Sequence, residues 1–394
     1  MEPKIINIGS INGEMQFEMI DTELCVVNSL RRIALTNINC LVFRGFPHTS
    51  NLINIQKNTS KFNNEYLKHR IQCIPICYSD ETNFDAFINQ YEVKLNVSND
   101  TNNIRYVTTE DLILYDKKTG NPVNTSGSIK TKQIFPPDSI TGHYIVIAVL
   151  MPKITEDDII EELQITMEFS LGNAKQDSCW NVVTKCCYEN KKDEVKLTKF
   201  FKKNPEIVNA YFKNDVNAIE TYMKTEMSEY DKKDFDLLNG QRFYNENNYI
   251  VKIESVGIYT TEEIMYKSCQ YIIKKLSEFI EYTKNANIEN SKINTGNEYG
   301  LFIDKSNTNL MYYLYIPTDD YTIGKIIEKY LYMMFSKDIY YVSFKKEHPH
   351  DNHSYVLFCY KNDTEVSSEI IINNLRSVSS ELIKIYEIIS SKFK

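Results

Sequence analysis

Two separate stretches of the chain carry apolar residues at steps of three and four. One begins near Thr261 and the other near Val366, and the second continues almost to the last of the 394 residues. These steps bring the apolar side chains onto one side of an α-helix, so each stretch predicts a long helix with one apolar seam. Such a helix needs a partner, and two matching seams predict that the helices bury each other. Together with Leu30 of an earlier helix, the predicted seam residues are Met265, Cys269, Ile272, Leu276, Phe279, Ile371, Leu375, Val378, Leu382, Ile385 and Ile389.

The elements before each seam follow the same order: a strand, a helix, a strand and then the long helix. In the first copy this order is interrupted by segments that alternate apolar and polar residues, such as YEVKLNVS from Tyr91 and LQITMEFS from Leu163. Alternation with a period of two predicts half-buried β-strands. The chain is therefore a diverged repeat with a β-rich insert. We predict an α+β fold in which two dimerisation units form an intramolecular pseudo-dimer.

The domain boundaries are predicted from changes in composition and period. A segment rich in Asn, Ser and Gly separates the two copies and is predicted to be a linker with one short strand. The predicted domains are a first dimerisation domain at 1–60 and 245–285, a β-rich insert at 61–244 with a charged irregular stretch at 190–247, a linker at 286–307, and a second dimerisation domain at 308–394.

The charge balance limits the partners of the chain. The formal net charge is −8. Non-specific binding to nucleic acid depends on Lys and Arg, so we expect contact with DNA or RNA to be only indirect. The longest apolar run, YIVIAVLM from Tyr144, is far shorter than the ~20 residues that cross a bilayer, so no membrane partner is expected.

No group of residues has the spacing of a catalytic or metal site. Cys179, Cys186 and Cys187 lack the paired short spacing of a tetrahedral zinc site, so buried thiols are the preferred interpretation. A short polar turn is predicted at His348, His350 and His353. The proline and the aspartate in this segment already account for its polarity, so a metal site is not needed to explain it. We therefore expect no catalytic residue, no cofactor and no bound metal, and a chain that is not an enzyme by itself.

The segment NSLRRIAL places two adjacent arginines in an otherwise apolar helix. At 100° per residue, Leu30 and Ile33 share an apolar arc. Asn28 and Arg32 lie on the opposite side of the helix, and Arg31 lies at the flank. Two interpretations follow, a solvated helix face and a docking face, and the pattern alone favours the solvated face.

Several segments, in their order along the chain, resemble α-like assembly subunits of multisubunit DNA-dependent RNA polymerase. The first part is similar to the third-largest subunit of polymerase II through VNSLRRIAL (27–35), NTSKFNNEYLKHRIQCIPI (58–76), LGNAKQDSCWNVVTKCCYE (171–189) and VKIESVG (251–257). The last part resembles the small partner of that subunit through DDYTIGKIIEKYLY (319–332) and SFKKEHPHDNHSYVLF (343–358). Having both partners in one chain resembles the fused polymerase subunit of large cytoplasmic DNA viruses.

The resemblance implies which residues dock onto partners. In the family, the arginine-bearing helix faces the large catalytic subunits, and the segment at 58–76 faces the second-largest subunit and a small zinc-bearing one. For the segment at 58–76, a surface network that holds the loop is an equally good interpretation. The small partner's helix usually carries an arginine where this chain has Glu328. The implied docking residues are Asn28, Ser29, Arg31, Arg32, Asn58, Thr59, Ser60, Glu65, His69 and Arg70.

The function implied by the resemblance is that of a non-catalytic assembly subunit, which scaffolds the two large catalytic subunits of a DNA-directed RNA polymerase. The implied partners are the large subunits, mainly the second-largest, and small polymerase subunits, with an internal pseudo-dimer in place of a homodimer. The implied location is intracellular, and for a virus it is the host cytoplasm and the virion. Two other interpretations stay open: an enzyme that uses the charged middle region, and a free protein-interaction module that uses this fold outside a polymerase.

Overall fold

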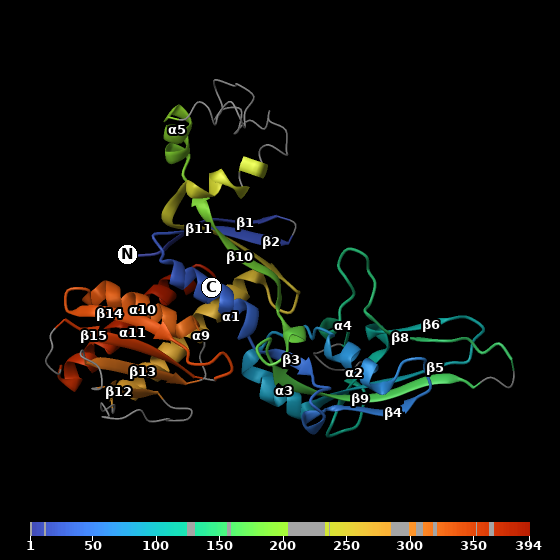
Figure 1. Ribbon diagram of the computed structural model, residues 1–394. Coiled ribbons are helices and arrows are strands. Elements are labelled where there is room, and N and C mark those ends of the chain that lie inside the picture. The colour runs from blue at the N-terminus through green and yellow to red at the C-terminus, as the bar shows by residue number, and fades with distance from the viewer. Residues whose placement is uncertain are drawn as a thin grey trace. The chain divides into compact units, whose positions relative to one another are not determined.

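A computed structural model describes the chain as two compact units (Figure 1). Unit 1 comprises residues 1–31, 186–253 and 272–392, and unit 2 comprises residues 32–185, 254–271 and 393–394. The residues that the structure describes are all except 1, 12, 124–130, 156–158, 204–232, 236, 285–298, 305–309, 318–320, 352 and 362–365.

One sheet of unit 1 is built from the first two strands of the chain and two later ones. Its order is β1-β2-β11-β10, formed by β1 (Lys4–Ile11), β2 (Glu14–Ile20), β10 (Val183–Lys192) and β11 (Tyr244–Ser255). β1 and β2 form an antiparallel hairpin. Its turn contains Gly13 at φ 85°, a conformation that glycine adopts without steric cost. Met15, Phe17 and Met19 of β2 are buried, because alternate side chains of the strand point to the core side.

The second sheet of unit 1 carries two helices. Its order is β12-β13-β15-β14, formed by β12 (Gly300–Asp304), β13 (Met311–Pro317), β14 (Ile339–Lys345) and β15 (His353–Tyr360), all antiparallel to their neighbours. Helix α10 (Thr322–Phe335) contacts β14, β15 and helix α11 (Ser368–Ser390). Gly324 allows this close approach, since a Cβ there would lie 2.3 Å from the ring of Phe344.

The two long helices with apolar seams are present where the periodicity predicts them. Helix α9 spans Thr261–Lys284, α11 spans Ser368–Ser390, and the earlier helix α1 spans Leu24–Thr36. All the predicted seam residues are buried. Within unit 1, the Arg376 guanidinium of α11 donates to the carbonyl of Thr283 in α9 at 3.1 Å. Lys329 of α10 forms an ion pair with Glu23 at 3.3 Å.

The sheet of unit 2 is organised around its longest strand. Strand β9 (Glu161–Gly172) pairs with β3 (Cys40–Phe43), β4 (Ile53–Asn58) and β5 (Tyr91–Asn99), and β5 pairs with β7 (Leu112–Asp116). A separate pair is formed by β6 (Arg105–Thr108) and β8 (Val146–Leu150). The predicted alternation is confirmed in β5 and β9, where every second side chain is buried. The described part of this unit includes helices α2 (Asn64–Gln72), α3 (Phe84–Gln90) and α4 (Thr131–Ile134), with short 3₁₀ turns at His48–Ser50, Glu81–Asn83, Thr109–Asp111 and Ser178–Trp180.

Strand pairing groups some residues differently from the predicted domains. Strands β3 and β4 precede residue 61, yet they pair with β9 of the predicted insert. The stretch 190–247, predicted to be irregular, contains α5 (Glu194–Lys203) and the 3₁₀ turn η6 (Asn239–Arg242). β12 is the one short strand that falls in the predicted linker, of which 286–298 and 305–307 lie outside the described residues. Across the residues with assigned positions, no helix has the length and apolarity needed to cross a membrane.

Candidate functional site

The turn after β4 is held by the side chain of Asn58. Its Oδ1 accepts from the backbone N–H and the hydroxyl of Ser60, at 3.0 and 2.7 Å. Its Nδ2 donates to the carbonyl of Phe62 and to Oδ1 of Asn64, both at 2.8 Å. Asn58 and Ser60 therefore fix the path of the chain between β4 and α2, as the interpretation of a loop-holding network expects.

Thr59 joins this turn to the beginning of β9. Its N–H donates to the carbonyl of Glu162 at 3.1 Å, and its hydroxyl accepts from the N–H of Glu162 at 2.7 Å. Lys57 also forms an ion pair with the Glu162 carboxylate. These contacts lie within unit 2 and bind the turn to its central strand. The docking role of Asn58, Thr59 and Ser60 stays a prediction.

Helix α2 is anchored at both ends. The side chain of Asn63 caps the first turn by accepting from the N–H of Tyr66 at 2.7 Å. Near the other end, Arg70 donates to the carbonyls of Val146 and Ile147 in β8, at 2.6 and 2.8 Å. The Arg70 guanidinium also lies 5.7 Å from the ring centroid of Tyr66. Arg70 thus positions α2 against β8, and only part of its side chain is accessible to a partner.

Two other predicted docking residues of α2 remain on the surface. Glu65 and His69 are both exposed and stand four residues apart, on neighbouring turns of the same face. The His69 ring is stacked on Phe46, with 4.0 Å between centroids and 13° between planes. This stacking fixes the orientation of the imidazole, so that the exposed face of α2 has a defined shape.

A cavity of about 350 Å³ opens beside this face. It lies between the end of α2, which supplies His69, Arg70 and Cys73, and the start of β8, and its floor is mainly isoleucine and valine. Ile145 is 44% exposed and Val146 is 37% exposed at its rim. A mainly apolar hollow with one anchored cation suits a protein side chain better than a polar metabolite.

The arginine-bearing helix α1 matches the predicted wheel. Leu30 and Ile33 of the apolar arc are buried, whereas Arg31 and Arg32 are half-buried. Arg31 Nε donates to Asn28 Oδ1 at 3.0 Å, so the two polar residues brace each other along the helix. Ser29 differs from the expectation of a surface residue, because it is buried with its hydroxyl 2.6 Å from that of Tyr386.

The comparisons with known proteins agree with this arrangement of elements. Residues 16–276 match the RNA polymerase Rpb3/Rpb11 dimerisation domain. The chain belongs to this family. It is also 25% identical over 277 residues to DNA-directed RNA polymerase II subunit RPB3 of Schizosaccharomyces pombe, covering 68% of this chain and 83% of that relative. The family match ends within α9, so α10, α11 and the second sheet of unit 1 lie outside it.

One set of contacts in this Rpb3/Rpb11-family chain was not predicted from the sequence. Gln72 at the end of α2 accepts from the N–H of Gly45 at 3.2 Å and donates to Asp177 at 2.5 Å. Arg44 lies over the ring of Trp180, 4.6 Å from its centroid. The signal available in the sequence was the single tryptophan, set in the segment 171–189 that carries the family resemblance. This network fixes the end of α2 and the cavity beside it.

Of the three cysteines predicted to be buried thiols, Cys186 is buried, whereas Cys179 and Cys187 are half-buried. Burial raises the pKa of Cys179 and of Cys186 to about 12, so both thiols are neutral at physiological pH. Among the residues whose positions are described, no group of three or more His, Cys, Asp or Glu side chains could hold a metal ion. The histidine turn is closed by its own hydrogen bonds, because His350 N–H donates to His348 Nδ1 at 3.2 Å and His348 N–H donates to Asp351 at 3.0 Å.

Proposed function

We propose that this chain is a non-catalytic assembly subunit of a DNA-directed RNA polymerase, in which both partners of an α-like heterodimer are fused. The observation that carries the proposal is the family match over residues 16–276, combined with a second strand-and-helix unit that follows it in the same chain. The related RPB3 of fission yeast is by name a subunit of polymerase II. Its role is carried over to this chain by that similarity. The viral origin and the intracellular location implied by the resemblance stay predictions.

The internal pseudo-dimer is supported by contacts within unit 1. The seam residues of α9 and α11 are buried, and Arg376 of α11 donates to the carbonyl of Thr283 in the last turn of α9. The Ser29–Tyr386 contact joins α1 to α11. In the proposed arrangement, α10 and α11 take the place that a second polypeptide holds in a two-chain heterodimer. A homodimer is then unnecessary, since the apolar seam is already covered.

The docking role is supported by two surfaces. On α1, Arg32 lies opposite the apolar arc and Arg31 lies at its flank, and both half-buried cations suit a contact to an acidic surface of a large subunit. On α2, Glu65 and His69 are exposed, and His69 lines the apolar cavity. We assign the α1 surface to the large catalytic subunits. The α2 surface is assigned to the second-largest subunit and a small one.

Affinity purification from the native source tests this proposal. The tagged full chain should bring down two very large subunits in near-equal amounts, and the eluate should incorporate nucleotides on a DNA template. The purified chain alone should incorporate none. Recovery of the chain with stable partners but without very large subunits would instead support a free interaction module. Incorporation by the isolated chain with magnesium would support the enzyme interpretation.

A further inference from the structure

A basic helix stands out in a chain of net negative charge. Residues 188–203 contain six lysines and three acidic residues, whereas the whole chain has a net charge of −8. Helix α5 lies in this segment, and its Leu197 and Phe201 are buried. At 100° per residue, Lys199, Lys202 and Lys203 fall on the opposite side of the helix from these two.

These three lysines have no carboxylate partner among the residues that the structure describes. Lys199, Lys202 and Lys203 are all exposed, and in the described part of the chain none of them forms an ion pair. Other lysines nearby are engaged, since Lys191 pairs with Glu18 at 2.5 Å and Lys196 with Asp193 at 3.5 Å. The outer face of α5 is therefore a patch of uncompensated positive charge, which we call the α5 basic face.

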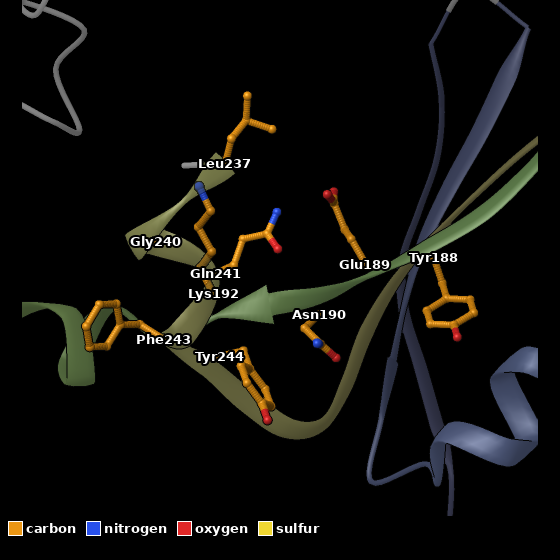
Figure 2. Close-up of a pocket in the computed structure, with 9 residues that line it drawn as sticks. All are labelled: Tyr188, Glu189, Asn190, Lys192, Leu237, Gly240, Gln241, Phe243 and Tyr244. Carbon is orange, nitrogen blue, oxygen red and sulfur yellow. The ribbon is translucent and has the colours of Figure 1, made fainter. Parts of the chain in front are cut away.

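A cavity of about 480 Å³ lies between the end of β10 and the start of β11 (Figure 2). Its lining combines aromatic rings, carboxamides and one ammonium group. These are supplied by Tyr188, Phe243, Tyr244, Asn190, Gln241 and Lys192. Figure 2 shows Lys192 and Gln241 extending to one side of β10 and Asn190 and Tyr244 to the other. Glu189 also borders the cavity, and its negative charge is compensated by an ion pair with Lys252 at 2.8 Å.

The helix and the cavity are held together as one feature of unit 1. Lys196 of α5 donates to the carbonyl of Tyr244 at 2.9 Å, and the N–H of Asp193 donates to the carbonyl of Phe243 at 2.9 Å. The rings of Phe200 and Phe243 lie 4.6 Å apart. These contacts hold α5, the helix that carries the α5 basic face, against two of the residues that line the cavity.

We propose that the α5 basic face and this cavity form a direct binding site for single-stranded nucleic acid. The lysines contact successive phosphates, and the cavity takes a base between aromatic faces, with the carboxamides on its polar edge. An acidic peptide would use the lysines but has no need of an aromatic, amide-lined cavity. The proposal goes beyond the assembly role. It also differs from the indirect contact predicted from net charge, because the positive charge is local.

Fluorescence anisotropy with the purified full chain tests this site. The probes are a labelled 20-nucleotide oligouridylate, the same length of oligothymidylate, a duplex DNA and a polyglutamate peptide. Replacement of Lys199, Lys202 and Lys203 together by Glu should weaken oligouridylate binding at least tenfold. A control triple replacement of the exposed Lys118, Lys337 and Lys392 by Glu makes the same change in net charge and should alter binding less than twofold.

Two further variants separate the phosphate contacts from the base contact. Replacement of the three α5 lysines by Gln should lower the magnitude of the slope of log affinity against log salt by about 2, since each single-strand phosphate contact contributes about 0.7. Tyr244→Ala should weaken binding about fivefold or more with an unchanged slope, because it removes stacking but no charge. Thermal unfolding checks that each variant is folded, and the Gln triple variant replaces the Glu variant if the latter unfolds.

The proposal is overturned by any of three results. One is equal weakening by the α5 and control triple variants, which would reflect overall charge alone. Another is polyglutamate binding as tight as that of oligouridylate, which would assign the α5 basic face to an acidic protein. The third is a combination of two findings. The Tyr244→Ala variant binds oligouridylate as tightly as the wild type, and the wild type binds duplex DNA as tightly as oligouridylate. Each of these readouts is independent of whether the chain captures polymerase subunits.

Discussion

The hydroxyl of Ser29 on α1 lies 2.6 Å from the hydroxyl of Tyr386 on α11, across 357 residues of sequence. Both side chains are buried. The Ser29 hydroxyl also donates to the carbonyl of Val26 at 2.6 Å, so it has a second partner within its own helix. A polar contact between two buried side chains favours one alignment of the two helices, because any other alignment would lose this hydrogen bond.

This contact predicts a measurable coupling. Ser29→Ala should lower the free energy of unfolding by about 1–2 kcal/mol, since it removes the hydroxyl that Tyr386 contacts on α1. Tyr386→Phe should cost less, because the Ser29 hydroxyl keeps the Val26 carbonyl. The double variant should be less destabilised than the sum of the two. Urea unfolding followed by circular dichroism measures all three, and the exposed Ser377→Ala should be nearly neutral. Strict additivity would contradict a direct contact.

A second prediction concerns the pH dependence of stability through Glu18. The hydrogen bond from Lys191 Nζ at 2.5 Å holds the pKa of Glu18 below its usual range, with a further bond from Asn7. A lowered folded-state pKa stabilises the protein above the unfolded pKa of about 4.3, and this contribution is lost as pH falls through the folded value. Glu18→Gln should therefore cost about 0.5–1 kcal/mol at pH 7 and progressively less below pH 4.

The measurement is the difference in unfolding free energy between wild type and Glu18→Gln at pH 7 and pH 3.5. Glu110→Gln is the matched control, because its ion pair with Lys132 is exposed on both sides. That control should change stability little at either pH. A Glu18→Gln penalty that stays constant between the two pH values would show that the carboxylate charge is not the stabilising feature.

Periodicity predicted the helices and most strands, because burial of one face leaves a repeating pattern in the sequence. The seam of α9 and the alternation of β9 are examples. Periodicity does not specify which strands pair across long loops, so the pairing of β3 and β4 with β9 was not predicted. Helix α5 was missed since its pattern is dominated by lysine, and its position depends on contacts of Phe200 and Phe201 with distant rings.

The candidate site was predictable in its residues but not in their roles. Asn58 and Arg70 belong to a segment that the family resemblance had singled out, but their hydrogen bonds are made to backbone groups of this chain. Only the folded arrangement separates such positioning residues from exposed ones such as Glu65. The need for glycine at position 324 is likewise visible only once Phe344 is placed against it.

A third prediction tests the α1 docking surface. Arg31→Glu with Arg32→Glu should leave the chain folded, because the buried arc around Leu30 is untouched. Capture of a large subunit should be reduced by an amount equivalent to about 2–5 kcal/mol if these charges are desolvated at the interface. Quantitative co-purification at moderate salt measures the effect. The exposed pair Lys337→Glu with Lys392→Glu should have no such effect, and equal capture by all three proteins would refute the docking role.

The final prediction concerns the fusion of the two halves. Residues 1–290 and 300–394, expressed as separate chains, should associate without the linker, since each would otherwise expose its apolar seam. Leu276 and Leu382 are fully buried, and replacing both by Asp should abolish association because an unpaired buried carboxylate costs several kcal/mol. Replacing Ser277 and Ser377 by Asp adds the same two negative charges at exposed positions of the same helices and should preserve association. Co-expression with a tag on one half provides the measurement, and a soluble untagged half that never co-purifies would remove the structural basis of the pseudo-dimer.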